Sequence, residues 1–322
     1  MSTTAIAAIS LSKLAQDVRA GLSKPGQKEL PCSYFYDEIG SALFEVITHL
    51  PEYGLSRAGE RLLRKHASAL ASQMPAPAVV AELGCGSGKN TRWLLEALLR
   101  KRPVTYCPIE ISAAALAACR HQLDDLAALT FLGFEREYLE GLAEVAAFRS
   151  AQEALLVLFL GSTIGNFSRP QGVRFLKQVR GNMMPGDSLL LATDLEKPVR
   201  QLLLAYDDPL GVTAAFNLNL LARLNRDLEA DFRLDLFRHV ARYNREERRI
   251  EMHLQSTSEQ TVTIPGAGFA VTLKRGETIW TESSHKYSLA DILRMAQQCG
   301  FRCDAQWVDE EWPFAHTLLI AE

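Results

Sequence analysis

The spacing of apolar residues changes along the chain and divides it into regions. Up to position 60, apolar residues recur every three or four positions over 11–22 and 41–50, which predicts amphipathic helices. Pro51 ends the second of these, and a third helix is predicted over 56–73. Short apolar runs then alternate with helical stretches; the predicted strands are 79–83, 104–111, 154–160 and 188–192, with helices such as 113–126 and 170–183 between them. This order predicts a parallel, doubly wound α/β sheet.

The pattern changes after Asp194. The predicted elements are helices over 198–207 and 212–227, alternating strand-like segments at 249–254, 260–264 and 269–273, a helix over 288–300 and a strand over 316–321. Ser288 is the expected N-cap of that last helix and Gly300 its C-cap. A sheet domain made of 61–196 and 287–322 is therefore interrupted by an insertion. We expect residues 1–60 and 197–286 to form a second, α+β lobe.

A glycine-rich turn follows the first predicted strand. The apolar run 78–83 leads into Gly84, Gly86 and Gly88, and helix-forming residues continue to Leu99. The loop lacks the Lys-Ser/Thr pair of a phosphate-binding P-loop, and its spacing differs from the dinucleotide form G-x-G-x-x-G. Glu82, Leu83 and then G-x-G-x-G are similar to the turn of S-adenosylmethionine (SAM) methyltransferases. The alternative is an ordinary glycine-rich turn between strand and helix.

Acidic residues after the next strands fit a nucleoside. In α/β folds of this kind, a carboxylate at the end of the second strand binds the ribose hydroxyls, and Glu110 holds that place. The alternative for Glu110 is a cap for the following helix. Glu137 and Tyr138 lie where a third strand, between the predicted strands 104–111 and 154–160, should end beside the adenine, with Glu135 as a competing choice.

The stretch F-L-G-S-T-I-G-N, 159–166, comes at the end of the predicted strand 154–160, which is the fourth strand when the one near the adenine is counted. Ligands of doubly wound sheets bind at the carboxyl ends of the strands, so Asn166 is expected to face the reacting groups. The alternative is a turn in which Asn166 adopts a positive φ.

Composition narrows the function class. The chain has 322 residues, 48% of them hydrophobic and 23% charged, and a net charge of -3. No basic balance favours nucleic-acid binding, no apolar run is long enough to span a membrane, and no basic segment marks a signal peptide. Six scattered cysteines without a C-x-x-C pair are typical of free thiols in a reducing cytosol, and the seven histidines show no metal spacing. We expect a cytoplasmic monomer with no metal and no nucleic-acid or membrane partner.

Several longer motifs point to one family. They are F-Y-D-x-x-G-S-x-L-F (35–44), L-P-E-Y (50–53), F-L-G-S-T-I-G-N (159–166), P-G-D-S-L-L-L (185–191), A-Y-D-D-x-x-G-V-T-A-A-F-N (205–217), R-I-E-M (249–252) and T-E-x-S-x-K-Y (281–287). Together they resemble the histidine-specific Nα-methyltransferases of ergothioneine biosynthesis, over nearly the whole chain. The resemblance implies a Rossmann-like SAM-methyltransferase sheet with a substrate-binding lobe. It also implies that three SAM molecules convert histidine to its trimethyl betaine, hercynine.

The resemblance also assigns residues. Asn166 and Tyr206 match positions that hold the carboxylate and amine of the substrate, and Tyr36 matches a tyrosine beside the amine. The remaining substrate positions are Tyr53, Glu282 and Ser284 for the imidazole, and Gly161, Thr213, Phe216 and Met252 along the pocket. The chain departs from some members at Gly54, where they carry a second aromatic residue, and at 88–90 in the glycine loop.

Glu282 and Ser284 alternate along a segment, 280–284, that we expect to be extended, so their side chains should share a face. A carboxylate and a hydroxyl can then read the two nitrogens of one imidazole. Structural alternatives are a core role for Tyr206, a helix-start role for Thr213 and plain packing for Phe216 and Met252. His253 and His285 are not expected to be ligands. Competing functions are methylation of another amino acid or imidazole compound, and SAM binding without turnover.

Overall fold

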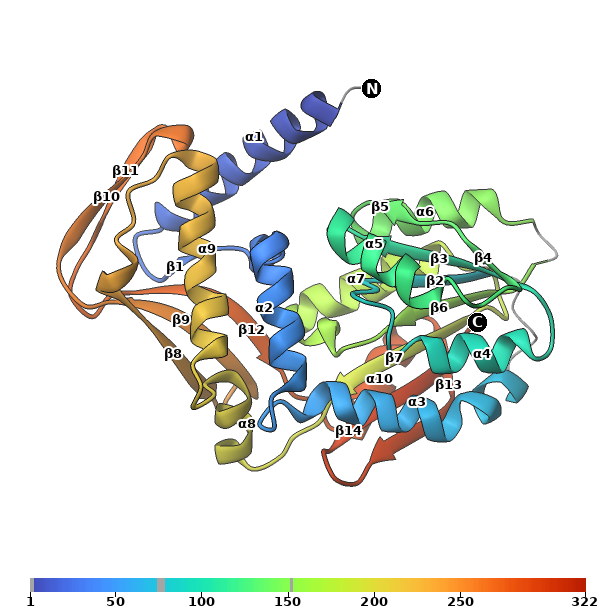
Figure 1. The fold of residues 1–322 in the computed structure, drawn as a ribbon. Helices are drawn as coiled ribbons and strands as arrows, with labels where there is room; N and C mark the ends of the chain where they lie inside the picture. The colour runs from blue at the N-terminus through green and yellow to red at the C-terminus, as the bar shows by residue number, and fades with distance from the viewer. Residues whose placement is uncertain (1–2, 74–78, 151–152) are drawn as a thin grey trace. The chain divides into compact units, whose positions relative to one another are not determined.

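A computed structural model describes residues 3–73, 79–150 and 153–322, with side chains from residue 13 onward. Met1, Ser2 and Ala78, which begin the N-terminal segment and the run before the glycine turn, lie outside this part. The chain divides into two units (Figure 1): unit 1 comprises Met1–Tyr53 and Pro198–Ser284, and unit 2 comprises Gly54–Lys197 and His285–Glu322. Each unit is described by itself below.

Unit 2 contains an eight-stranded sheet that confirms the predicted parallel core. Its path runs β13-β14-β7-β6-β2-β3-β4, with β5 paired to β3. The strands are β2 (Val79–Leu83), β3 (Val104–Glu110), β4 (Leu129–Phe131), β5 (Phe134–Glu135), β6 (Leu155–Phe159), β7 (Ser188–Asp194), β13 (Phe301–Asp309) and β14 (Phe314–Ala321). Strands β2 to β7 pair in parallel, whereas β14 runs antiparallel to β7 and β13 antiparallel to β14. The predicted doubly wound sheet thus ends on an antiparallel edge.

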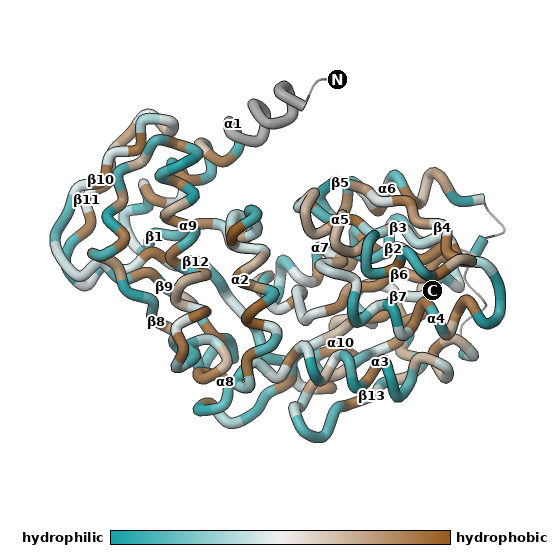
Figure 2. Tube along the Cα trace, viewed as in Figure 1, coloured by the Kyte–Doolittle hydropathy of each residue, from teal (hydrophilic) through white to brown (hydrophobic). Residues whose placement is uncertain are grey.

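Helices cover both faces of this sheet. They are α3 (Gly54–Gln73), α4 (Arg92–Leu99), α5 (Ala113–Leu123), α6 (Tyr138–Phe148), α7 (Arg169–Gly181) and α10 (Leu289–Gln298). One apolar core lies under α6, α7 and α10, and the other lies under α3, α4 and α5. Every residue of β2, β6, β7 and β14 is buried, as expected for strands covered on both sides. Figure 2 shows these central strands as hydrophobic segments.

The helix ends refine the sequence expectations in unit 2. Helix α4 begins only at Arg92, after a turn through Asn90 and an N-cap at Thr91. The predicted N-cap of α10 is confirmed, because the Ser288 side chain accepts from the backbone of Asp291. Its predicted C-cap is wrong by one position. Cys299 is the C-cap, and Gly300 follows it with a φ of 79°, where glycine carries no steric penalty.

Unit 1 is an α+β arrangement built on a four-stranded sheet, β1-β12-β9-β8, and a separate hairpin, β10-β11. Its strands are β1 (Lys28–Glu29), β8 (Phe237–Asn244), β9 (Arg249–Ser256), β10 (Gln260–Ile264), β11 (Phe269–Leu273) and β12 (Thr278–His285), the last ending one residue inside unit 2. Its helices are α1 (Thr3–Leu22), α2 (Glu38–His49), α8 (Val199–Tyr206) and α9 (Val212–Leu228), with a 3-10 turn η1 (Cys32–Phe35). Helix α9 packs on β8, β9 and α2. The sequence reading did not anticipate β8, whose side chains are mostly half-exposed and polar.

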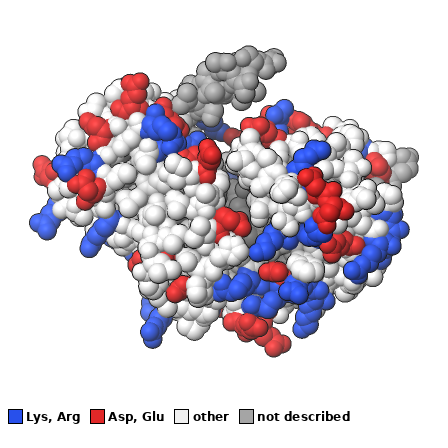
Figure 3. All heavy atoms as spheres, in the orientation of Figure 1, with Lys and Arg blue, Asp and Glu red and all other residues white. Residues whose placement is uncertain are grey.

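Surface charge is mixed. Figure 3 shows basic and acidic side chains interspersed over the visible face. Within the described ranges, no helix combines the length and the apolar character that crossing a bilayer would require.

Candidate functional site

The glycine turn after β2 is held in a conformation that other residues rarely adopt. Gly84, Gly86 and Gly88 have φ values of 80°, 50° and 70°. A side chain at any of them would be strained. A Cβ atom built on Gly86 meets nothing within 4 Å, so the space beside this residue is open. The turn therefore offers bare backbone to a ligand.

Glu110 reaches this turn from the end of β3. Its Oε2 accepts from the backbone N–H of Gly86 at 3.4 Å, and its Oε1 accepts from the N–H groups of Ile111 and Ser112 at 2.9 and 3.1 Å. Burial raises the pKa of the Glu110 carboxyl, and the backbone donors oppose that rise. The N-cap of α5 is Ser112, whose hydroxyl accepts from Ala115. Glu110 thus lies at the turn, where a ribose-binding carboxylate is expected.

The residues proposed for the adenine lie on the neighbouring segment. Glu135 pairs with Glu110 in the register of β5 and β3. Glu137 is the N-cap of α6, and Tyr138 is its first residue. A Cβ atom built on Gly84 would lie 3.1 Å from the Tyr138 hydroxyl, so this tyrosine packs against the glycine turn. The fold therefore gathers the predicted cofactor residues at one edge of the sheet of unit 2.

The loop after β6 holds the predicted Asn166 at the end of a 3-10 turn, η2 (Thr163–Asn166). Gly161 and Ser162 carry positive φ values of 69° and 61°, whereas Asn166 does not. The alternative explanation of Asn166 as a left-handed turn residue is therefore wrong. Ser162 takes that conformation instead, and its Oγ accepts from the backbone N–H of Asp194 at 2.8 Å. This bond ties the loop to the end of β7.

Unit 1 contains a chain of aromatic rings that includes four of the predicted substrate residues. Tyr36 lies 5.7 Å from Phe44 and 6.0 Å from Phe216, measured between ring centroids. Phe44 lies 6.2 Å from Tyr53, which lies 6.1 Å from Tyr206. Edge-on contacts dominate, as aromatic quadrupoles favour. Segments near residues 36, 53, 206 and 216 are thus brought together by the fold.

Tyr206 links this aromatic chain to β12. Its hydroxyl oxygen lies 2.7 Å from the Oγ of Ser284. The predicted extended segment 280–284 is confirmed as part of β12, in which Glu282 and Ser284 alternate with Thr281 and Ser283. The Tyr206 phenol therefore contacts the Ser284 hydroxyl, and the Glu282 carboxylate lies two residues before Ser284 on the same strand. Such a set can donate to and accept from a polar ring.

Two further substrate candidates are buried nearby in the same unit. Thr213 is the second residue of α9, and its backbone N–H donates to Oδ1 of Asp208 at 2.7 Å. Met252 lies in β9, the neighbour of β12, and its carbonyl accepts from the hydroxyl of Thr281 at 3.0 Å. Both side chains are almost fully buried. A packing role for them remains compatible with these contacts.

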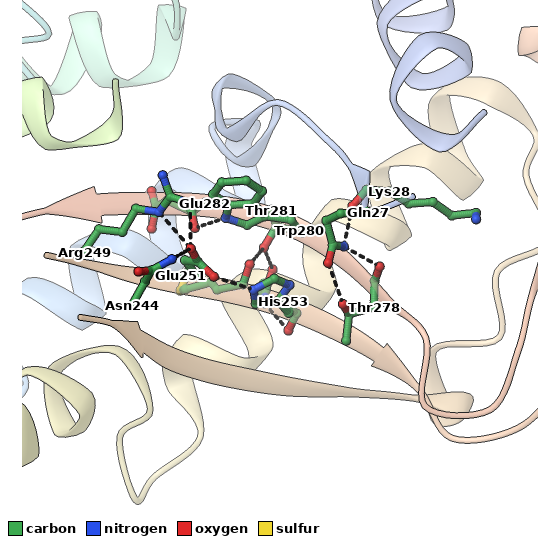
Figure 4. A network of polar contacts seen from close by, with 12 residues as sticks. Gln27, Lys28, Asn244, Arg249, Glu251, His253, Thr278, Trp280, Thr281 and Glu282 are labelled. Atoms are coloured by element: carbon green, nitrogen blue, oxygen red, sulfur yellow. Dashed lines mark hydrogen bonds and ion pairs between the residues drawn. The ribbon is translucent and has the colours of Figure 1, made fainter. Parts of the chain in front are cut away.

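A polar network that the sequence reading missed supports the strand that carries Glu282 (Figure 4). The indole Nε1–H of Trp280 donates to the backbone carbonyl of Glu282 at 2.8 Å. The guanidinium of Arg249 lies 4.5 Å from the Trp280 ring and pairs with Glu251 at 2.7 Å. His253 stacks on the same ring at 6.1 Å and is buried, as expected for a core histidine. The alternation within R-I-E-M could have revealed the Arg249–Glu251 pair, because residues two apart share a face of a strand.

In the part of the chain that the structure describes, no group of three or more His, Cys, Asp or Glu side chains is placed to hold an ion. All six cysteines are free thiols. His285 is buried and its Nδ1 lies 2.9 Å from the carbonyl oxygen of Gly165. The bare glycine turn and the nearby Glu110 carboxylate, by contrast, fit a nucleoside-containing methyl donor.

Comparison with known proteins shows to which family the chain belongs. The family model described as histidine-specific, SAM-dependent methyltransferase matches residues 14–321. A histidine N-alpha-methyltransferase of Mycobacterium tuberculosis is 40% identical over 95% of this chain and 94% of its own length. A histidine N-alpha-methyltransferase of Mycolicibacterium smegmatis is 38% identical over 95% of this chain and 94% of its own length. An L-tryptophan methyltransferase of Psilocybe serbica is 26% identical over 93% and 90%. The chain belongs to the family of SAM-dependent, histidine-specific methyltransferases.

Proposed function

We propose that this protein transfers three methyl groups from SAM to the α-amino group of L-histidine, giving hercynine, the first step of ergothioneine biosynthesis. The observation that carries the proposal is the set of side chains in unit 1: Tyr53 and Tyr206 in ring contact, Ser284 on the Tyr206 hydroxyl, and Glu282 on the same strand. Family membership supplies the reaction class. The polar set in unit 1 suits imidazole recognition.

The residue types suit methyl transfer. When bound, SAM would supply a methyl group on a sulfonium: the lone pair of a neutral amine would form a bond to the methyl carbon in line as the carbon–sulfur bond breaks, with S-adenosylhomocysteine as the leaving group. Positioning of that amine carries most of the catalysis, and the amine must lose its proton before its lone pair can react. We propose that Tyr36, Tyr206 and Asn166 orient the amine and carboxylate. Hydroxyl and amide groups can do so without competing as nucleophiles.

Ring recognition is proposed for Tyr53, Glu282 and Ser284. A carboxylate that accepts from one imidazole N–H makes a stronger bond than a neutral acceptor. Gly161, Thr213, Phe216 and Met252 are proposed to shape the pocket. A site built on such polar contacts rejects apolar analogues better than an apolar slot of the same size.

For the methyl donor, we propose that Gly84, Gly86 and Gly88 face SAM, that Glu110 binds its ribose, and that Glu137 and Tyr138 flank its adenine. The proposed ribose role of Glu110 is supported by the 3.4 Å bond that its carboxylate accepts from the Gly86 N–H, because this bond brings the carboxylate to the turn. We keep as proposals a monomeric protein without nucleic-acid or membrane partners and a cytoplasmic location, the last supported by the six free thiols.

The second candidate is another amino acid as substrate. The 26% identical relative from Psilocybe serbica carries the name of an L-tryptophan methyltransferase, so that relative is named for an amino acid with a different ring. Glu282 and Ser284 favour histidine, because an indole has only one ring nitrogen and that nitrogen is a donor.

One experiment separates the two halves of the proposal. Calorimetry should measure SAM affinity, and steady-state kinetics should measure histidine turnover, for the native protein, Asn166→Ala and Glu110→Ala. We expect Asn166→Ala to weaken histidine use about tenfold or more while SAM affinity stays unchanged. We expect Glu110→Ala to weaken SAM affinity. Unchanged SAM affinity in Glu110→Ala would refute the ribose assignment. If Asn166→Ala lowered SAM affinity as much as it lowered histidine turnover, the substrate role of Asn166 would be refuted.

A further inference from the structure

A buried carboxylate lies beneath the glycine turn of unit 2. Glu82, near the end of β2, is 2% exposed. Thr91 donates its hydroxyl to Oε1 at 2.7 Å, and the Tyr106 hydroxyl donates to Oε2. Among the described residues, no cationic side chain acts on this carboxyl, so burial raises its pKa to about 7. Glu82 is therefore held by hydroxyl groups rather than by an ion pair.

The bond from Thr91 joins the two ends of the turn. Glu82 precedes the glycines and Thr91 follows them as the N-cap of α4. Threonine at an N-cap ordinarily bonds the exposed N–H groups of its own helix, yet the Thr91 side chain makes no such bond. The backbone of Thr91 is already helical, with φ of -64° and ψ of -27°, and its hydroxyl bonds Glu82 across the turn.

Tyr106 provides a second link between Glu82 and the glycine turn, through Cys119. It lies on β3 opposite Val80 of β2, and its hydroxyl is 3.7 Å from the Sγ of Cys119 on α5. A Cβ atom built on Gly88 would lie 2.6 Å from that sulfur, so Cys119 packs directly against the third glycine. Glu82 is thus linked to the turn through Thr91 on one side and through Tyr106 and Cys119 on the other.

The turn needs such support because it contains three glycines. Glycine loses more backbone freedom on ordering than any other residue, so a free turn of this sequence would sample many conformations. Its own backbone bonds include Gly88 N–H to Cys85 O at 2.9 Å and Gly84 N–H to Ile109 O at 2.8 Å. A third bond, from Arg92 N–H to Gly88 O at 3.2 Å, reaches the first residue of α4, but none of the three joins the start of α4 to the end of β2.

We propose that Glu82 is a positioning residue for the cofactor: through Thr91 it fixes the start of α4 to the end of β2 and so holds the glycine turn ready for SAM. The proposal rests on the SAM site proposed above. It assigns to Glu82 and Thr91 no contact with SAM or with histidine. Loss of the bond should therefore weaken SAM binding by loosening the turn, and histidine binding should not change.

A matched pair of variants tests this. Thr91→Val keeps the shape and removes the hydroxyl, whereas Thr91→Ser keeps the hydroxyl. Calorimetry should give the SAM affinity of each, and kinetics at saturating SAM should give the KM for histidine. We expect Thr91→Val to raise the Kd for SAM about tenfold, as loss of one hydrogen bond to a carboxyl allows, and Thr91→Ser to stay within about twofold of the native value. The KM for histidine should stay unchanged in both.

Three results would overturn the inference: native SAM affinity in Thr91→Val, equal loss in Thr91→Ser, or a KM for histidine that rises with the Kd for SAM. If Thr91→Val does not fold, Thr91→Ala takes its place, because it also removes the hydroxyl but puts no second methyl group beside the Glu82 carboxyl. A Kd for SAM about tenfold above the native value then supports the inference, and native SAM affinity contradicts it. Native protein that binds SAM but leaves histidine unmethylated would refute the proposed function without touching this inference.

Discussion

The hydroxyl oxygens of Tyr206 and Ser284 lie 2.7 Å apart and join the end of α8 to β12 within unit 1. Either hydroxyl can be the donor, and each uses one hydrogen-bonding position on the other. Two proposed substrate residues, one for the amine and one for the imidazole, are thereby coupled. Changing one should disturb both ends of the amino acid.

Tyr206→Phe tests the coupling. The ring contact with Tyr53 is kept, but the hydroxyl is lost, which leaves Ser284 without this partner. We expect the KM for histidine to rise about tenfold or more, with SAM affinity unchanged. Tyr243→Phe, on half-exposed β8, is the matched control and should behave as the native protein. Unchanged histidine kinetics in Tyr206→Phe would show that its hydroxyl has no part in the site.

Glu282→Ala tests the ring specificity. Loss of the carboxylate should lower kcat/KM for histidine at least about tenfold, the equivalent of roughly 1.4 kcal/mol, and should admit larger aromatic amino acids. Kinetics with histidine, tryptophan and phenylalanine measure this. Ser283→Ala, one position along β12 and out of the alternation, is the control. A Glu282→Ala variant that still strongly prefers histidine would place recognition elsewhere, most directly at Tyr53.

Gly54 is the first residue of α3, a position at which the sequence resemblance implies an aromatic residue in some family members. A Cβ atom on Gly54 would lie 2.2 Å from the indole of Trp312, within unit 2, so the tryptophan occupies the space. We expect Gly54→Ala to lower the free energy of unfolding by about 1–3 kcal/mol, as overpacking does. Denaturant unfolding measures this. Adding Trp312→Leu should make Gly54→Ala less harmful than it is alone; equal harm in both backgrounds would refute the steric explanation.

Glu82 should give stability a pH dependence of unusual sign. Its pKa is about 7 in the folded protein, raised by burial from 4.5. Between these values the unfolded chain releases the proton first, so stability falls as pH rises and the loss is complete above pH 7. Each unit of pKa difference corresponds to about 1.4 kcal/mol, which gives a loss on the order of 3 kcal/mol. Urea unfolding at several pH values should show this contribution disappear in Glu82→Gln. Identical pH profiles for the two proteins would contradict it.

The parallel sheet and the glycine turn could be predicted from sequence, because continuous apolar runs and glycine spacing are local signals. The Tyr206–Ser284 bond could not, because it joins positions far apart in the chain. The contact of Arg249 with the Trp280 ring could not be predicted for the same reason, whereas the Arg249–Glu251 pair lies within one strand and follows from the alternation of side chains. Strand β8 could not be predicted from the sequence, because its partly exposed residues lack a strong alternation of apolar and polar side chains. The bond from Thr91 to Glu82 could not be predicted either, because a threonine just before a helix is expected to cap that helix.

The reaction itself is the central claim, and product analysis tests it most directly. Purified protein, SAM and each of histidine, tryptophan and an imidazole lacking the α-amine should be incubated separately and followed by mass spectrometry. The account predicts trimethylated histidine, with three molecules of S-adenosylhomocysteine formed for each, and no methylation of the amine-free imidazole. Methyl groups on the imidazole ring, or preferred methylation of tryptophan, would contradict it.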